Sequence, residues 1–279
     1  IKPSNFKSYL LNNVDRGIIN SRFELNFDEN FNVSNFAVDG DVKKLSINIL
    51  NKVNIIETNF SFQLNKQSLN LQNIFGTIND LPIRSGNINI NKSNGYEIEG
   101  NLPFNASVNN KKIKKILKGF YDNKIFENEL LLKFKANNNF FLDFDQTLKL
   151  KKYEYEVSGE LNNSYLSLKK FINNSYVNFD KKINKIFFNK TKFIYTNNSK
   201  NKNTLSIEGE YNFNDKSFQK FKVNKSIKNK NHIINLNIDW NEAIKLEIIN
   251  YFKNNKISAN INADFIFSKN FLNINKLHY

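Results

Sequence analysis

The chain of 279 residues contains no cysteine and no methionine, one tryptophan, two histidines, three prolines and nine glycines. Without cysteine, a disulfide framework, a thiolate zinc site and a cysteine nucleophile are excluded. No apolar run reaches the roughly 18 residues of a membrane-spanning helix, and no signal peptide is visible. No Pro- or Gly-rich linker marks a domain boundary. Because the chain begins at Ile1, we expect it to be an excerpt of a longer protein.

Residues that could carry out catalysis are also scarce, since catalysis needs positioned acids, bases or nucleophiles. His278 is next to the last residue, and His232 follows the turn-like segment KNKN, which favours a solvated turn position. Asp143 and Asp145 share one strand face, where solvated carboxylates are favoured over a calcium site. A Gly-rich phosphate loop, a metal-binding histidine pair and a Gly-x-Ser-x-Gly elbow are absent from the sequence. We therefore predict a non-enzymatic protein with no metal and no cofactor.

The net charge of +15 arises from 41 Lys and Arg against 26 Asp and Glu. Such an excess is typical of nucleic-acid binding. However, Asn, Lys, Ile and Phe dominate the chain, as A/T-rich codons would produce, and lysines also protect exposed strand edges. We predict a solvated basic surface and no nucleic-acid partner, with attraction to anionic lipid headgroups as the alternative.

Most of the chain alternates apolar and polar residues, which predicts β-strands with one apolar face. Between residues 127 and 161, Leu130, Leu132 and Phe134 alternate with polar neighbours, and a polar break separates them from a second run at 140–144. We count roughly fifteen such strands, joined by turns of Asn, Asp and Lys. Short amphipathic helices are predicted at 4–17 and 109–121, with a weaker candidate at 166–176.

Three strand segments share a pattern in which a glycine follows alternating residues: YEIEGNL, YEVSGEL and LSIEGEY, with Gly100, Gly159 and Gly209. A glycine inside a strand indicates a bulge or a bend. Chance similarity among alternating strands is the other interpretation.

The apolar face of so many strands needs a cover, and two short helices are too small to provide it. A closed barrel or a two-sheet sandwich would cover itself. A long sheet curled into a trough would instead present its apolar lining to acyl chains. Strands lie about 4.8 Å apart, so fifteen of them would span on the order of 70 Å. Alternation alone does not separate groove-lining residues from core residues, and Trp240 fits both positions.

The order of elements resembles the AsmA-like superfamily, and most closely its YhdP-type repeated β module. The segments that carry the resemblance are FKSYLLNNVDRGIINSRFELNF, NFAVDGDVKKLSINI, FSFQLNKQSLNLQNIFGTINDLPIRSGNINI, IEGNLPFNASVNNKKIKKILKG and LLLKFKANNNFFLDF. They show a helix ending at glycine before a strand, several alternating strands, and a strand that runs into a short helix. The resemblance covers roughly residues 4–267 and rests on element order and patterning.

The resemblance implies a mostly β fold: a long antiparallel curled sheet, or elongated β-groove, with two or three short amphipathic helices. AsmA-like proteins are anchored in the inner membrane of Gram-negative bacteria, extend through the periplasm and serve outer-membrane biogenesis. Like the eukaryotic bridge-like lipid transfer proteins, they are thought to move phospholipid acyl chains along the groove. This chain departs from the family in showing no anchor helix.

For this chain we therefore expect two modules in one continuous sheet, residues 1–108 with an N-terminal helix and 109–279 beginning with a short helix. We expect a periplasmic location, with the parent chain anchored in the inner membrane. The expected partners are phospholipid acyl chains, together with inner- and outer-membrane proteins reached through the parent chain.

The residues expected to line the groove are Phe23, Leu25, Phe60, Phe62, Leu64, Ile88, Ile90, Leu130, Leu132, Phe134, Leu142, Tyr155, Val157, Ile207, Tyr211, Leu236, Ile238, Trp240, Ile261 and Phe265. A second hypothesis is a structural or assembly factor of the cell envelope, similar to the TamB branch, that binds partners by strand addition. An outer-membrane barrel is disfavoured by the amphipathic helices and the irregular strand lengths.

Overall fold

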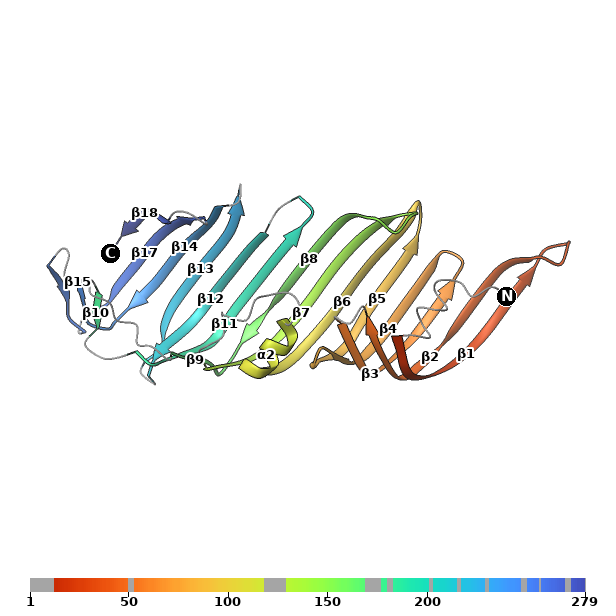
Figure 1. Cartoon of the computed structure of the whole chain (residues 1–279), viewed down its shortest axis with the longest axis horizontal. Helices are drawn as coiled ribbons and strands as arrows, with labels where there is room; N and C mark the ends of the chain where they lie inside the picture. Colours follow the sequence, from red (N-terminus) through yellow and green to blue (C-terminus); the bar gives the residue numbers. More distant parts are fainter. Residues whose placement is uncertain are drawn as a thin grey trace. The chain divides into compact units, whose positions relative to one another are not determined.

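The structure is a computed structural model, and it describes residues 13–49, 53–117, 129–168, 177–179, 183–200, 203–214, 217–228, 231–246, 250–255, 257–268 and 272–278. Nearly all of these residues are in strands (Figure 1). Fifteen strands form one long antiparallel sheet, and three short strands form a second sheet. The prediction of a mostly β chain with a long antiparallel sheet is confirmed.

The strands follow the chain order over most of the long sheet, which runs β1 to β8, then β11 to β14, β17 and β18, while β9 pairs with β7 and β11. These strands are β1 (Val14–Phe27), β2 (Val33–Ile49), β3 (Val53–Asn65), β4 (Ser68–Ile78), β5 (Leu81–Lys92), β6 (Gly95–Asn109), β7 (Glu129–Asp145), β8 (Leu150–Leu161), β9 (Ser164–Ser167), β11 (Lys185–Asn198), β12 (Asn203–Phe213), β13 (Gln219–Lys228), β14 (Asn231–Trp240), β17 (Ala259–Phe267) and β18 (Leu272–His278). The small sheet contains β10 (Val177–Phe179), β15 (Ile244–Leu246) and β16 (Tyr251–Lys253).

The chain divides into two compact units. Unit 1 contains Ile1–Ala106 and Ala136–Glu156, and unit 2 contains Ser107–Lys135 and Val157–Tyr279. The first boundary falls close to the expected module boundary at 108/109, and residues 136–156 join unit 1. The expected assignment of two groove modules stays a prediction.

Helices are rarer than expected in the described residues. The predicted helix at 109–121 is present as α2 (Asn110–Leu117), with the rest of that range outside the described residues. For the helix predicted at 4–17, the last four residues were predicted wrongly, because Val14 to Gly17 belong to β1. Its first nine residues lie outside the described residues. In the candidate at 166–176, Leu166 and Ser167 are in β9, and 169–176 are outside the described residues.

The polar break predicted after Ala136 is also wrong, because β7 runs without interruption from Glu129 to Asp145. Asn137, Asn138 and Asn139 are therefore strand residues. Their backbone groups can join the ladder like those of any other residue, so three consecutive asparagines do not by themselves end a strand.

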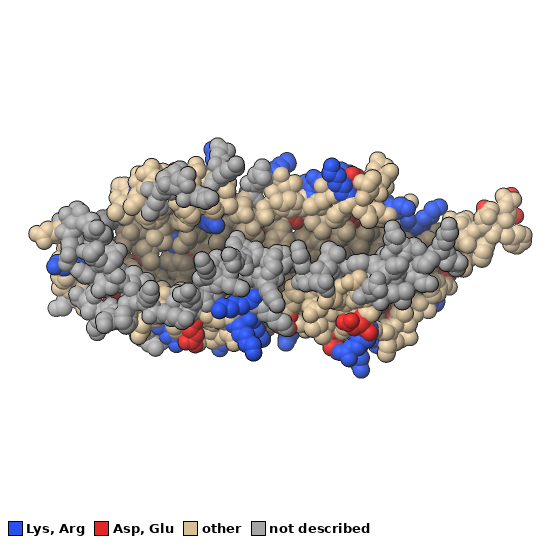
Figure 2. Space-filling view, in the orientation of Figure 1, with Lys and Arg blue, Asp and Glu red and all other residues tan. Residues whose placement is uncertain are grey.

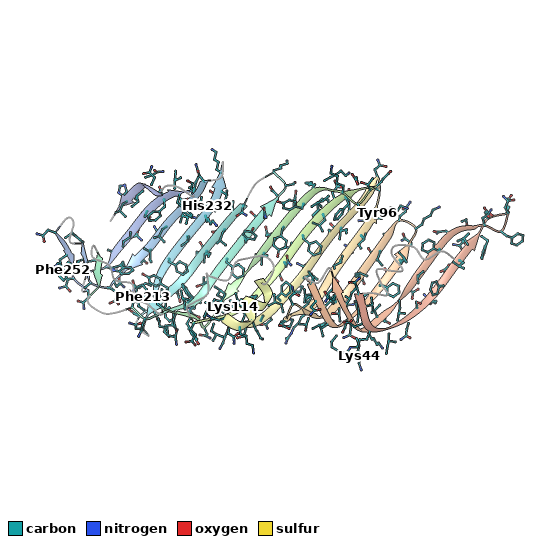
Figure 3. All side chains as sticks on the ribbon, in the orientation of Figure 1. Lys44, Tyr96, Lys114, Phe213, His232 and Phe252 are labelled. Carbon is teal, nitrogen blue, oxygen red and sulfur yellow. The ribbon has the colours of Figure 1, made fainter. Side chains whose placement is uncertain are left out.

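Left-handed residues bend the strands of unit 1. Lys44, Glu57, Asn73 and Ser85 have φ of 53°, 51°, 53° and 61°, one in each of β2 to β5. The pairing register shifts by one residue at each of them. An extra residue in one strand of a pair bends that strand and increases its local twist. A bulge in four successive strands therefore bends this part of the sheet (Lys44 is labelled in Figure 3).

Unit 2 contains a bulge of the same kind in β11. Lys190 has φ 44°, and the register shifts between Asn189 and Lys192 opposite β12. Gly209 of β12 faces the bulge, and the Thr191 side chain, fully buried, lies over it. In unit 1, Thr58 follows the bulge at Glu57 and lies over Gly76 in the same way. The bulge expected near the strand glycines is thus confirmed for Gly209. Gly100 instead makes room for the ring of Phe140.

Asparagine side chains satisfy the N–H groups at several bulges. The N–H of Lys44 donates to Asn59 Oδ1 at 2.9 Å, that of Asn73 to Asn87 Oδ1 at 3.3 Å, and that of Lys190 to Asn162 Oδ1 at 3.1 Å. Each bulge takes its N–H out of the ladder, and an unsatisfied backbone donor costs free energy. Part of the asparagine content therefore has a structural role in addition to turn formation.

The hydrogen bond from the Lys190 N–H to Asn162 is expected to contribute to stability. We expect Asn162→Ala to lower the free energy of unfolding by about 1–2 kcal/mol, because the Lys190 N–H loses its acceptor. Asn162→Asp keeps an acceptor oxygen in the same place but loses the amide that donates to Glu160 Oε1 at 2.7 Å. Both substitutions are therefore compared in the Glu160→Gln background, where Asn162→Asp is expected to retain most of the stability. Urea unfolding followed by circular dichroism measures both variants. Equal losses in the two variants would contradict the capping role.

Candidate functional site

In unit 1, one side of the sheet is apolar in register across six strands. The row of directly opposed residues from β1 to β6 is Phe23, Val38, Leu64, Leu69, Ile90 and Ile98. The adjacent row on the other side is Arg22, Asp39, Gln63, Asn70, Asn89 and Glu99. Polar contacts cross this second row, for example Arg22 to Asp39 at 3.1 Å. The two rows differ by one residue in each strand, so one face is apolar and the other polar.

Unit 2 repeats this arrangement. The apolar row from β11 to β18 is Phe193, Ile207, Val223, Leu236, Ala263 and Leu277. The polar row beside it is Lys192, Glu208, Lys222, Asn237, Asn262 and His278. On that polar side, Lys222 forms an ion pair with Glu208 at 3.1 Å, and the amide of Asn237 donates to Asn262. We name the apolar side of each unit its apolar face.

The register places most of the expected lining residues on these faces. Those of unit 1 are Phe23, Leu25, Phe60, Phe62, Leu64, Ile88 and Ile90; those of unit 2 are Ile207, Tyr211, Leu236, Ile238, Trp240, Ile261 and Phe265. Leu130 joins the face of unit 2 through Leu166 and Ile186. Leu132 and Phe134 follow Leu130 at intervals of two residues in β7, so they lie on the same face. Leu142 lies two residues after Phe140 and therefore on the same face; Phe140 contacts Gly100 in unit 1.

A few of these residues pack inside the protein. Tyr211 and Trp240 are 3% and 9% exposed, and they form a buried cluster with Ile183 and Phe213 in unit 2. The rings of Phe213 and Trp240 lie 5.2 Å apart (Phe213 is labelled in Figure 3). The Tyr211 hydroxyl donates to the carbonyl of Asp239 at 2.5 Å, and burial raises the pKa of Tyr211. These two residues therefore act in core packing at one end of the face.

Unit 1 has its own buried cluster, formed by Ile74, Ile83 and Leu102. Phe60, Ile88 and Phe140 pack against it while remaining partly exposed. Phe62 is buried. The cluster lies beside the bulges at Asn73 and Ser85, and Ile74 directly follows the first of them. The bulges thus direct apolar side chains into a local core.

Most of the remaining apolar-face residues are only partly covered. Leu64, Ile90, Ile207, Leu236, Ile238, Ile261 and Phe265 are half-buried, as are Leu130, Leu132, Phe134, Leu142 and Val157. Phe23 is 68% exposed, Leu25 49% and Tyr155 36%. Figure 2 shows a recessed surface over β5 and β6 in unit 1, and another over β12 and β13 in unit 2; both are mostly tan, with a few charged atoms among them. A large apolar area therefore stays accessible in each unit.

Several polar side chains of the described residues interrupt the apolar faces, and the sequence reasoning missed the position of three of them. Asn138 lies two residues from both Ala136 and Phe140 in β7, so it shares their face. Its Oδ1 is buried with no hydrogen-bond partner among the described residues. Lys225 lies opposite Leu205 and Ile234. His232 lies opposite Ile227 and Phe267. A longer check of the alternation would have found Lys225, which follows Phe221 and Val223 at intervals of two.

The prediction for His232 was wrong. It is a half-buried residue of β14, and its ring stacks on Phe267 with centroids 4.8 Å apart. Strand β14 begins at Asn231, two residues earlier than the predicted start at Ile233.

The carboxylates considered for calcium have other partners. Asp145 accepts hydrogen bonds from Thr147 and from the N–H of Lys149, and these bonds lower its pKa. Asp143 pairs with Lys151 at 3.3 Å. Among the described residues, no cluster of three or more His, Cys, Asp or Glu could hold a metal ion.

The buried Lys253 of the small sheet donates to the carbonyls of Glu242 and Asn254 at 3.0 and 3.3 Å, and burial lowers its pKa. These contacts fix the backbone around β16 and give the lysine a structural role. No helix in the described part of the chain is long and apolar enough to cross a membrane.

Comparisons of the chain with protein-family models, with curated proteins and with solved structures give no significant match. The arrangement of the two faces is therefore the basis for a functional interpretation.

Proposed function

We propose that the apolar faces bind acyl chains of phospholipids and shield them from water. The observation that supports this most directly is the row-by-row separation of the two sides of the sheet. In each unit a six-residue row is entirely apolar, while its neighbour on the other side is entirely polar. A soluble protein rarely leaves so much connected apolar surface accessible without a partner for it.

Acyl chains fit such a surface for an energetic reason. Moving one CH₂ group from water to an apolar surface is favourable by about 0.8 kcal/mol, so a long chain gains substantially without any specific contact. The rows repeat Ile, Leu, Val and Phe, so that neighbouring positions along the sheet offer similar binding free energy. Similar free energies allow a chain to move from one row to the next without being trapped.

Together with the resemblance to AsmA-like proteins, this suggests a non-enzymatic segment of an elongated β-groove that carries phospholipid between the inner and outer membranes. The bulges in β2 to β5 support curvature within unit 1, which a groove requires. On this proposal the chain works in the periplasm of a Gram-negative bacterium, and its parent chain is anchored in the inner membrane.

Native mass spectrometry of the chain purified from bacteria, with lipid extraction of the same sample, tests the proposal. We expect several phospholipid molecules per chain with mixed headgroups, because the faces recognise acyl chains. A well-folded chain without lipid would contradict the proposal.

That contrary result would favour the second hypothesis, an assembly factor acting through strand edges. The observation in its favour is the exposure of β1, the terminal strand of the long sheet. Its side chains Ile19, Phe23 and Phe27 are 64%, 68% and 57% exposed. An edge strand presents unpaired backbone groups to which a partner strand can add.

A further inference from the structure

The apolar face of unit 2 contains one lysine among apolar neighbours. Lys225 lies in the row Tyr195, Leu205, Lys225, Ile234, Phe265 and Ile274. It is half-buried, and no carboxylate pairs with it among the described residues. On the other side of the same strand, Lys222 pairs with Glu208. A lysine among apolar neighbours and without a carboxylate partner can attract an anion that reaches this face.

His232 lies diagonally from Lys225 on the next strand, because Lys225 faces Ile234 and His232 faces Ile227. Diagonal neighbours in a sheet are about 7–8 Å apart, within reach of long side chains. The Nδ1 of His232 is buried without a hydrogen-bond partner among the described residues, and its ring is held by stacking on Phe267. His232 is the second residue of β14, and Figure 3 labels it where that strand begins, after the turn from β13.

Resting on the proposed function, we propose that Lys225 and His232 bind the phosphate of a lipid headgroup whose acyl chain lies on the apolar side of β13 and β14. A phosphate carries several acceptor oxygens, so it can accept from the ammonium on one side and from an imidazole N–H on the other. It would neutralise the lysine. With a rotation of the His232 ring, whose Nδ1 is buried in this structure, it would also supply the missing partner of that nitrogen. An uncharged lipid could hydrogen-bond to the histidine through a hydroxyl or an ester carbonyl, but it could not neutralise the lysine.

The face next to this pair is long enough for an acyl chain. From His232 to Trp240 the strand advances eight residues, or roughly 27 Å. One leaflet of a bilayer gives its chains only about 15 Å, half of the hydrocarbon core. The side chains along this path are Val223, Leu236, Phe221 and Ile238. The small Ala263, opposite Leu236, leaves room beside them.

Binding of two lipids with the same acyl chains to the delipidated 279-residue chain tests the inference. We expect phosphatidylglycerol to bind more tightly than diacylglycerol. Lys225→Gln should weaken phosphatidylglycerol binding about tenfold, the loss of one charge-assisted hydrogen bond, and leave diacylglycerol binding unchanged. His232→Gln should act in the same direction. Lys220→Gln, which removes the same charge from the other side of β13, is the matched control and should change neither affinity.

Several outcomes would overturn the inference. Equal binding of both lipids by the wild type and by Lys225→Gln would refute the phosphate site while leaving the acyl-chain proposal intact. Failure of both lipids to bind would refute both. If inorganic phosphate binds in a Lys225-dependent way and phosphatidylglycerol does not, the site belongs to free phosphate. Should Lys225→Gln fail to fold, the salt dependence of the wild type decides: only phosphatidylglycerol binding should weaken in high salt.

Discussion

Replacing Gly209 by alanine is expected to lower the free energy of unfolding by about 2–3 kcal/mol, in the upper part of the range for overpacked sites. A Cβ built at Gly209 would lie 2.5 Å from both the Cα and the Oγ1 of Thr191. Carbon atoms in contact normally stay about 3.5–4.0 Å apart. Because Thr191 is fully buried and follows the bulge at Lys190, its backbone has little freedom to move.

Gly17→Ala is the matched control within β1. Its Cβ would lie 3.3 Å from Leu45 Cδ1, the end of a flexible side chain. We expect no loss of stability there, and a gain of about a few tenths of a kcal/mol, because alanine restricts the unfolded chain. Urea unfolding with matched m-values measures both variants. A Gly209→Ala variant as stable as Gly17→Ala would show that the bulge and the glycine are not coupled.

Adding Thr191→Ala to Gly209→Ala removes the contact with Oγ1 but leaves those with Cα and Cβ of residue 191, at 2.5 and 2.8 Å, and is expected to recover part of the loss. A coupling free energy between the two positions would show that they act as a pair. Gly76 and Thr58 form the same arrangement in unit 1, with a Cβ at Gly76 lying 2.8 Å from the Thr58 Cα. Gly76→Ala should therefore cause a loss of the same order.

The alternation in the sequence was sufficient to predict which residues share a face, because a strand has a period of two whatever its partners are. Phe23 and Leu64, far apart in the sequence, lie in one row as their patterns required. The same pattern did not say how much of the face is covered. Tyr211 and Trp240 alternate like Leu236 and Ile238, and only the surrounding elements decide that the first two are buried.

The bulges were harder to predict, because a bulge is a relation between two strands and not a property of one segment. Lys44, Glu57 and Lys190 adopt left-handed backbone although nothing in their side chains favours it. The N–H groups of Lys44 and Lys190 depend on Asn59 and Asn162, 15 and 28 residues away, and the N–H of Glu57 depends on the hydroxyl of Ser46. The position of His232 was missed for a related reason. A turn-like segment predicts approximately where a strand begins, but it does not predict the residue at which pairing begins.

Replacing Phe265 by glutamate is expected to weaken phospholipid binding at least about tenfold while the chain stays folded. Phe265 lies on the apolar face between Ile234 and Ile274, and it is half-buried, so its removal opens no closed cavity. A carboxylate there would have to lose water whenever an acyl chain covers it, which costs several kcal/mol for an unpaired charge. Lipid loading is measured by native mass spectrometry and folding by circular dichroism.

The neighbouring Ile266→Glu provides the control, because Ile266 points to the other side of the sheet, opposite Ile233 and Asn273. It places the same charge on the same strand and should leave lipid loading unchanged. If both variants lose lipid equally, the charge acts at long range or through folding, and the apolar face is not the binding surface. If Phe265→Glu unfolds, Phe23→Glu in unit 1 takes its place: at 68% exposure Phe23 contributes little to the core. A folded Phe23→Glu variant that loads lipid like the wild type, together with an unfolded Phe265→Glu, would mean that the apolar faces serve packing and not lipid.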